Sequence, residues 1–279
     1  MPELPEIAHL NRCLEPVLSG AVVREVKLSR PDIVGRGGST SSLLRGEQIK
    51  GLLRHGKQLA IVSCRGPAIC VHLGMSGQLW HCPPGERLRR HDHVHCVWHL
   101  DGTRGRVGGR LVFRDPRRFG GLWCFASMDE LTATRWSHLG PDALTVDVRT
   151  LRRSLAGTRR SIKAALLDQH VVAGIGNIYA DEILFAAGIH PQSAAARLGA
   201  DQCRRLARCI RRVLASATAR GGSTIRDYVD GQGRPGSFSL QHRVYGRATQ
   251  PCTSCGKPLR QVTEAQRTTV FCPVCQPLF

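Results

Sequence analysis

The chain has 279 residues, of which 42% are hydrophobic and 22% are charged, so its length allows about two domains with real cores. No apolar stretch approaches the length of a transmembrane helix, so we do not expect an integral helical membrane protein. The 40 Lys and Arg residues exceed the 21 Asp and Glu residues and give a formal net charge of +19. This surplus favours a polyanion partner, with nucleic acid as the first candidate.

The N-terminus reads Met1-Pro2-Glu3-Leu4-Pro5-Glu6 and carries no apolar segment of a signal peptide. We therefore expect a cytoplasmic protein. In that reducing compartment, eight of the cysteines are most simply small buried hydrophobic residues. These are Cys13, Cys64, Cys70, Cys82, Cys96, Cys124, Cys203 and Cys209.

The same N-terminus holds a candidate nucleophile. Because the second residue is small, we expect Met1 to be removed, which leaves Pro2 with a secondary amine that is partly unprotonated near neutral pH. An amine can attack the aldehyde carbon of a sugar and form a Schiff base. Glu3 and Glu6 supply carboxylates for proton transfer. Many chains begin in this way without such chemistry, so the hypothesis depends on the rest of the chain.

Apolar residues at helical spacing predict a helix over residues 7–18, with Gly20 as its stop. Strand-like runs follow and are separated by turns rich in Gly, Pro and Arg, which predicts a β-sandwich or barrel. These runs are residues 21–28, 58–64, 68–73, 94–100, 110–114 and 121–125. His91, His93 and His95 alternate along one run, which we interpret as a solvated strand face and not as a metal site.

From about Asp129 the pattern becomes helical, with predicted helices over residues 161–169, 177–187 and 201–220. The sequence Gly174-Ile175-Gly176-Asn177 leads into the second helix, with Asn177 as its predicted N-cap. Such a turn can bind a phosphate at the helix N-terminus, or it can simply be a tight turn between helices. The last helix carries a polar face to which we assign no role, made of Arg204, Arg208, Arg211 and Arg212.

Near the C-terminus, Cys252-x2-Cys255 and Cys272-x2-Cys275 are separated by sixteen residues. This spacing is typical of a structural zinc ribbon, in which four thiolates surround one Zn²⁺ tetrahedrally. The surrounding sequence is poor in large apolar side chains, so metal binding would supply its folding energy. Two unrelated cysteine pairs or disulfides are the alternative.

Several blocks of the sequence, taken together, resemble the bacterial formamidopyrimidine-DNA glycosylase family. The blocks run in the family's order along nearly the whole chain: residues 1–6, 72–77, 91–94, 115–120, 172–182 and the Cys-x2-Cys ribbon. The resemblance implies an α+β, two-domain fold, with an N-terminal β-sandwich behind a leading helix, then a helical helix–two-turn–helix domain and a C-terminal four-Cys zinc finger. The implied boundaries are 1–128 for the sandwich, 129–150 for a linker, 151–245 for the helical domain and 246–279 for the zinc finger.

The resemblance also implies an activity. The family excises oxidised purines, chiefly 8-oxoguanine and formamidopyrimidines, from duplex DNA and then cleaves the strand at the abasic site by β,δ-elimination. Pro2 resembles the nucleophile that attacks the deoxyribose C1′ carbon, and Glu3 the general acid/base. Glu6 resembles a supporting acid, and Lys57 the lysine that contacts the phosphate at the lesion.

The remaining implied residues contact DNA. Met75, Arg117 and Phe119 resemble the wedge that fills the space of an extruded base, and side chains of these kinds suit unstacked bases. Asn177 and Arg267 resemble phosphate ligands, and His72 and Arg118 lie in the same DNA-contacting motifs. Residues 221–245 match the family's loop over the extruded base. The resemblance also implies one structural Zn²⁺, bound by Cys252, Cys255, Cys272 and Cys275. We further expect a monomer that associates with the bacterial nucleoid through its binding to DNA.

Two other hypotheses stay open. An enzyme similar to endonuclease VIII would share the fold and the nucleophile but would prefer oxidised pyrimidines. A zinc-ribbon protein that binds nucleic acid without catalysis would make the N-terminal glutamates incidental.

Overall fold

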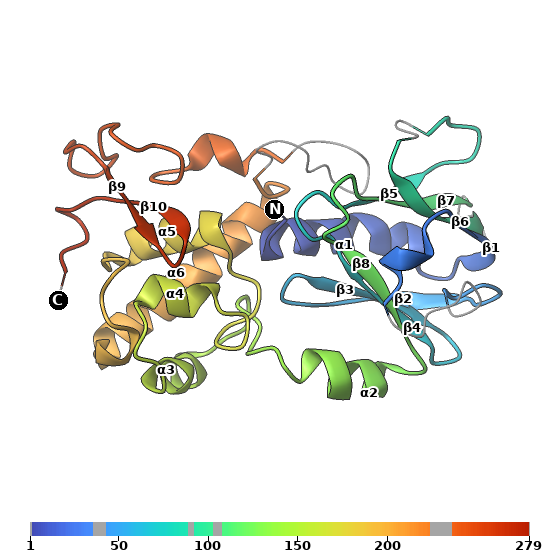
Figure 1. The fold of residues 1–279 in the computed structure, drawn as a ribbon, viewed down its shortest axis with the longest axis horizontal. Helices are drawn as coiled ribbons and strands as arrows, with labels where there is room; N and C mark the ends of the chain where they lie inside the picture. Colours follow the sequence, from blue (N-terminus) through green and yellow to red (C-terminus); the bar gives the residue numbers. More distant parts are fainter. Residues whose placement is uncertain (1, 36–42, 89–91, 103–107, 224–235, 279) are drawn as a thin grey trace. The chain divides into compact units, whose positions relative to one another are not determined.

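The computed structural model describes residues 2–35, 43–88, 92–102, 108–223 and 236–278. The chain divides into two compact units (Figure 1). Unit 1 comprises Met1–Ser137 and Gly221–Ser237, and unit 2 comprises His138–Arg220 and Phe238–Phe279. No helix in the described ranges is long and apolar enough to cross a membrane.

Unit 1 begins with helix α1 (Leu4–Leu18), whose apolar residues recur every three or four positions and therefore share one face. Ile7, Leu10 and Leu14 on that face are at most 1% exposed. Pro5 lies in the first turn, where its missing N–H costs no helical hydrogen bond. The start of α1 is thereby fixed directly behind Pro2 and Glu3.

Two four-stranded antiparallel sheets form the body of unit 1. The strand order of the first sheet is β1-β6-β7-β5, with β1 (Val22–Leu28), β6 (Val94–Asp101), β7 (Gly109–Arg114) and β5 (Gln78–Cys82). The order of the second is β2-β3-β4-β8, with β2 (Ile49–His55), β3 (Gln58–Ser63), β4 (Ala68–His72) and β8 (Gly121–Phe125). One apolar cluster contains side chains of both sheets and of α1, such as Leu10, Trp98 and Ile69. The predicted sandwich is confirmed, and the six predicted strands correspond to β1, β3, β4, β6, β7 and β8.

The structure corrects two interpretations of the sequence, one of histidines and one, in part, of cysteines. His95 is only 5% exposed, and its Nε2 lies 2.8 Å from the carbonyl oxygen of Asp115, so this histidine is a buried partner of a loop. His93 is exposed and precedes the strand with a positive φ of 58°, while His91 lies outside the described residues. Cys64 is exposed and Cys13 and Cys124 are half-buried, so only the other five cysteines of that group are buried as expected.

Short helices lie beyond the sandwich. Helix α2 (Met128–Leu131) continues into a π-helical turn, Thr132–Trp136, and both cover the outer face of the second sheet through Leu131 and Trp136. The Oε1 atom of Gln58 accepts hydrogen bonds from Arg135 Nε at 2.8 Å and from Trp136 Nε1 at 3.2 Å. These bonds fix the start of β3, directly after Lys57. The remaining short turns are 3₁₀-helical: Pro31–Ile33, Ala195–Arg197 and Phe238–Gln241.

Unit 2 contains helices α3 (Val148–Ala156), α4 (Ile162–Leu167), α5 (Asn177–Ala187) and α6 (Ala200–Ala219). Nearly every residue of α5 is buried, so the other elements pack around it. The three predicted helices of this unit correspond to α4, α5 and α6, whereas α3 was not predicted. The prediction that Asn177 caps α5 was wrong by one residue: Gly176 is the N-cap, with extended backbone, and Asn177 is the first helical residue.

The C-terminal ribbon is a hairpin of β9 (Arg260–Glu264) and β10 (Arg267–Phe271), which pair in an antiparallel register. Ala265 and Gln266 connect them, both with positive φ, at 49° and 58°. Two consecutive residues with positive φ form the type of tight hairpin turn whose twist matches that of the strands. Arg267 therefore stands at the tip of the hairpin, where β10 begins.

Candidate active site, metal centre and nucleic-acid contacts

The residues around the expected nucleophile are buried at the start of α1. Glu3 is 2% exposed and Glu6 is 1% exposed. The Oε2 atom of Glu6 accepts the Glu3 N–H at 2.7 Å, and its Oε1 atom accepts the Ser223 N–H at 2.6 Å. The positive end of the helix dipole also favours negative charge at this position. Pro2 precedes this pair and is buried, while Met1 lies outside the described residues.

A glycine permits the close approach of the distant segment to Glu6. Gly222 has a φ of +79°, and a Cβ atom there would lie 2.3 Å from Glu6 Oε1. Any other side chain would collide with the carboxylate and would also strain the backbone. Gly222 and Glu6 thus fix the start of the predicted recognition loop, of which residues 224–235 lie outside the described residues.

The far end of that predicted loop is held in unit 2 by another buried carboxylate. Glu182 on α5 is 3% exposed, and its oxygens accept the backbone N–H groups of Arg243, Val244 and Tyr245 at 2.9–3.0 Å. Charged acceptors of this kind form the stronger class of hydrogen bonds. No local sequence pattern indicated this role of Glu182, because its partners are about sixty residues away in the chain.

Lys57 and His72 lie near one another in the second sheet of unit 1. Lys57 occupies the turn between β2 and β3, and Gln58, the next residue, pairs with His72 at the end of β4. Burial lowers the pKa of His72, and together with the nearby cations Arg135 and Lys57 it brings the value to about 4. His72 is therefore neutral at physiological pH, and any DNA contact it makes is a hydrogen bond and not an ion pair.

The three predicted wedge residues lie on two neighbouring loops of unit 1. Met75 is 44% exposed and Phe119 is 54% exposed, although both are large and apolar. The Arg117 guanidinium carbon lies 4.6 Å from the centre of the Phe119 ring, which is cation–π geometry. Arg118 differs from its neighbours, because its backbone has a φ of 53° and its guanidinium pairs with Asp32 at 2.8 Å.

One buried carboxylate, which the sequence did not single out, joins the two wedge loops. Asp115 is fully buried, and its Oδ1 atom accepts the Ser76 hydroxyl at 2.6 Å while its Oδ2 atom accepts the Gly120 N–H at 2.7 Å. Ser76 in turn accepts the Arg117 N–H at 3.2 Å. A Cβ atom at Gly74 would lie 2.4 Å from the Gly120 nitrogen, so the loops are also in close backbone contact. Asp115 thus sets the positions of all three wedge residues.

The two predicted phosphate ligands of unit 2 lie on elements that contact each other. The Asn177 side chain donates from Nδ2 to the carbonyl oxygen of Thr268 at 3.1 Å, and Thr268 follows Arg267 in β10. Asn177 Oδ1 is buried without a hydrogen-bond partner among the described residues. The first turn of α5 and the start of β10 are therefore side by side.

A buried ion pair fastens the same hairpin to the helices. Lys163 on α4 is fully buried, and its Nζ atom lies 2.6 Å from Asp181 Oδ1 and 2.7 Å from Thr269 Oγ1. The other Asp181 oxygen accepts the Val270 N–H at 3.0 Å. Burial raises the pKa of Asp181 to about 6, and the Lys163 charge opposes that shift. Loss of either charge would leave the other buried and unpaired.

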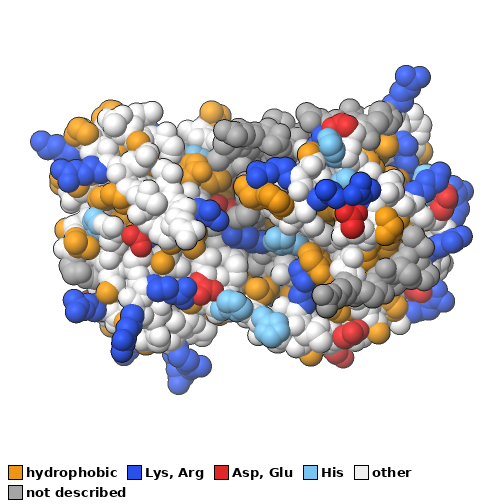
Figure 2. All heavy atoms as spheres, viewed as in Figure 1, with side chains coloured by type: hydrophobic (Ala, Val, Ile, Leu, Met, Phe, Trp, Pro, Cys, Tyr) orange, Lys and Arg blue, Asp and Glu red, His pale blue; other side chains and the backbone are white. Residues whose placement is uncertain are grey.

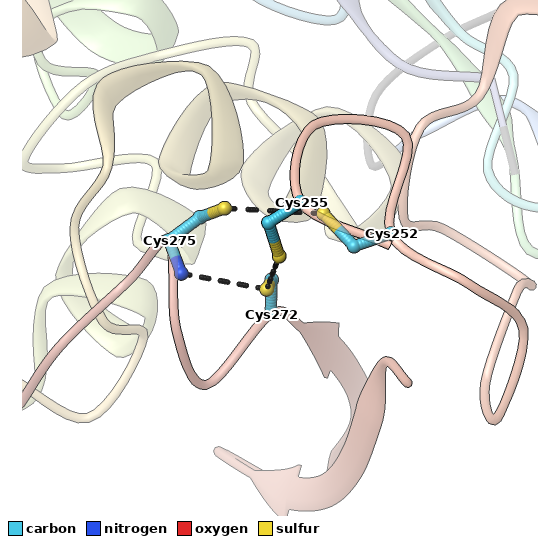
Figure 3. Close-up of side chains that lie close together, drawn as sticks. All are labelled: Cys252, Cys255, Cys272 and Cys275. Carbon is cyan, nitrogen blue, oxygen red and sulfur yellow. Dashed lines mark hydrogen bonds between the residues drawn. The ribbon is translucent and has the colours of Figure 1, made fainter. Parts of the chain in front are cut away.

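The four ribbon cysteines converge as expected. Their sulfur atoms all lie within 4.8 Å of one another, with 3.9 Å between Cys252 and Cys275 and 3.5 Å between Cys255 and Cys272 (Figure 3). Tetrahedral Zn–S bonds of about 2.3 Å require sulfur separations of about 3.8 Å. The group is thus positioned to bind one Zn²⁺, and four protein ligands leave no open position, so the metal is structural.

Comparison with protein families covers most of the chain. The model for the formamidopyrimidine-DNA glycosylase N-terminal domain matches residues 1–122, and the model for the H2TH domain of the same enzymes matches residues 139–229. The chain belongs to the formamidopyrimidine-DNA glycosylase family. A third model, the zinc finger found in FPG and IleRS, matches residues 250–278.

Individual members of the family resemble the chain over their full length. The formamidopyrimidine-DNA glycosylases of Shewanella oneidensis and Shewanella halifaxensis are each 39% identical to it and are covered completely, as is at least 99% of this chain. The crystal structure of MutM (Fpg) from Thermus thermophilus is 37% identical with a TM-score of 0.86, and each chain is covered completely. Lactococcus lactis Fpg in complex with abasic-site DNA is 31% identical with a TM-score of 0.87 and 99% coverage of both chains.

Proposed function

We propose that the protein is a bifunctional DNA glycosylase and abasic-site lyase of base excision repair, which removes oxidised purines from duplex DNA. The observation that carries the proposal is the buried pair Glu3 and Glu6 behind Pro2 at the start of α1, in a member of this family. The substrate class is 8-oxoguanine and formamidopyrimidines, as in the enzymes that this chain resembles.

The chemistry follows from an amine beside a carboxylic acid. The Pro2 nitrogen, free after removal of Met1, attacks C1′ of the damaged nucleotide, and the bond from C1′ to the base breaks as the base leaves with a proton. The Pro2 nitrogen gives up its proton and Glu3 protonates the ring oxygen, which opens the sugar and leaves a cationic Schiff base, an iminium ion, between Pro2 and C1′. Loss of the C2′ proton then expels the 3′ phosphate, and a second elimination expels the 5′ phosphate.

Glu6 has a supporting role in this scheme. Each of its oxygens already accepts a backbone N–H, one from Glu3 and one from Ser223. We therefore assign it to holding Glu3 and the start of the recognition loop in place. Direct proton transfer falls to Glu3.

The remaining residues bind the duplex and hold the extruded nucleotide. Extrusion is necessary because the bond from the sugar to the base is out of reach inside stacked DNA. Lys57, Asn177 and Arg267 bind backbone phosphates, with His72 and Arg118 beside the lesion strand. Met75, Arg117 and Phe119 fill the vacated space. Zn²⁺ holds the ribbon that carries Arg267. We further propose that the protein acts as a monomer on nucleoid DNA in the cytoplasm.

The test is incision of matched duplexes that carry 8-oxoguanine opposite cytosine, thymine glycol opposite adenine, or no lesion. We expect the 8-oxoguanine duplex to be cut most rapidly, and the Glu3→Gln variant to lose base release while it keeps some cleavage of a preformed abasic site. Preferential incision at thymine glycol would instead support an enzyme similar to endonuclease VIII. Lesion binding without incision by the wild-type protein would support the non-catalytic zinc-ribbon hypothesis.

A further inference from the structure

A basic hollow of unit 2 lies outside the residues assigned above. It has a volume of about 570 Å³ and lies between helix α3 and the first turn of helix α6. Four arginines line it: Arg149, Arg152 and Arg153 from α3, and Arg204 from α6. The sequence showed the arginines of α6 as a polar face, but it could not show that those of α3 stand opposite them.

The arginines of α3 have no acidic partners within the described part of the chain. None of the described Asp or Glu side chains forms an ion pair with Arg149, Arg152 or Arg153, and all three are exposed. Arg204 pairs with Asp201. The nearby carboxylate of Asp147 is occupied as the N-cap of α3, where it accepts the Thr150 N–H at 2.8 Å. The hollow therefore carries an uncompensated positive charge, and basic side chains project from the lower edge of unit 2 in Figure 2, where Figure 1 shows α3.

The N-terminus of helix α6 adds to the positive electrostatic potential of the hollow. Helix α6 has twenty residues, and Ala200, its first residue, lines the hollow. The unpaired N–H groups of a helix N-terminus attract anions, and the helix dipole has the same sign there. On the other side, Leu151 and Leu155 anchor α3 to the core, so the arginines at positions 149, 152 and 153 face outward together.

We propose that this hollow is a second DNA-binding surface, which binds backbone phosphates of a duplex segment other than the one that carries the lesion. Arginine forks match phosphate oxygens in pairs. Arg149 and Arg153 are separated by about 6 Å along the helix axis, and phosphates of one strand recur every 3.4 Å of DNA axis, so α3 faces about two successive phosphates. The hollow uses none of the elements that carry Asn177 and Arg267. Such a surface would retain the protein on DNA during its search for lesions.

The experiment measures binding of a second duplex to the full-length zinc-bound protein. The protein is first saturated with a short unlabelled duplex that contains a stable abasic-site analogue, and a labelled undamaged duplex is then titrated and followed by fluorescence anisotropy. The variant is Arg149→Gln/Arg152→Gln/Arg153→Gln. The control, Arg12→Gln/Arg45→Gln/Arg87→Gln, removes the same charge from exposed positions of unit 1.

We expect the α3 variant to bind the second duplex at least about tenfold more weakly than the wild type, and the control variant to change by less than about twofold. Loss of about two phosphate contacts also makes the slope of log K against log salt less steep by about 1.8, since each contact contributes about 0.9. Incision of a short lesion duplex should be unchanged.

Four results would overturn the proposal: failure of the wild type to bind the second duplex, equal loss in both variants, loss of short-duplex incision in the α3 variant alone, or displacement of the duplex by micromolar pyrophosphate. The last would show a site for free phosphates and not for DNA. Absence of incision by every form would count against the proposed function only, because the readout is binding.

Discussion

Replacement of Asp115 by Asn tests whether one carboxylate positions the wedge. The substitution keeps the size of the side chain but removes its charge, and one oxygen becomes an NH₂ group that cannot accept from Ser76 or Gly120. Hydrogen bonds to a charged group contribute about 1.5–3 kcal/mol each. Loss of one such bond and weakening of the other costs about 2 kcal/mol. If this cost falls on the conformation that inserts the wedge, excision slows about 30-fold.

The assay compares two substrates in single-turnover reactions: a stacked 8-oxoguanine duplex and a duplex with a preformed abasic site. Only the first must be opened by the wedge, so the Asn variant should lose about 30-fold on the first and a few-fold on the second. Phe119→Ala should show the same selectivity, and the double variant should lose little more than either single change, since both act on one step. The matched control is Asp129→Asn, which alters an exposed carboxylate. Equal losses on both substrates, or additive losses in the double variant, would show that Asp115 does not act by positioning the wedge.

Three further predictions concern a buried ion pair, the zinc ribbon and a buried histidine. Lys163→Met leaves Asp181 buried and unpaired and should destabilise the protein by about 3–5 kcal/mol in thermal or urea unfolding, whereas Lys163→Met/Asp181→Leu should recover most of that loss. Cys255→Ser, or removal of zinc by a chelator, should unfold the ribbon and displace Arg267, and should therefore weaken lesion-DNA binding in a mobility-shift assay. Normal binding by zinc-free protein would contradict this prediction. Because the pKa of His72 is lowered to about 4 in the folded protein, the unfolded chain binds a proton at this histidine more readily. The free energy of unfolding should therefore fall by about 3 kcal/mol as the pH drops from 6.5 to 4. His72→Gln should remove this part of the acid sensitivity.

The sequence was most informative where a function depends on neighbouring residues. The ribbon was predicted because its two Cys-x2-Cys turns are local patterns, and the structure brings their sulfur atoms within 4.8 Å. Pro2 and Glu3 were accessible to the same kind of reasoning, since an N-terminal amine and its acid are adjacent in the chain. Most strands were predicted from apolar runs, but β2 was missed because Gly51 and charged residues interrupt it.

Residues that act across long separations were not accessible in this way. Asp115 contacts Ser76, 39 positions earlier, and Lys163 contacts Thr269, 106 positions later. Each would look like an ordinary charged residue until the loops or helices around it are placed. His95 shows the opposite error: its alternation with His93 indicated a solvent-facing strand, but the loop at Asp115 covers it. Side-chain alternation gives the face of a strand and not what packs on that face.

Covalent trapping at the N-terminus tests whether Pro2 is the nucleophile. An iminium ion can be reduced irreversibly to an amine, so sodium borohydride added during reaction with an 8-oxoguanine duplex should yield a stable protein–DNA adduct. Digestion and mass spectrometry should place the DNA on a peptide that begins at Pro2, without Met1. We expect one such adduct, which Glu3→Gln diminishes on the lesion duplex but not on a preformed abasic site. An adduct on Lys57, or strand cleavage without any adduct, would contradict the assignment of Pro2 as the nucleophile.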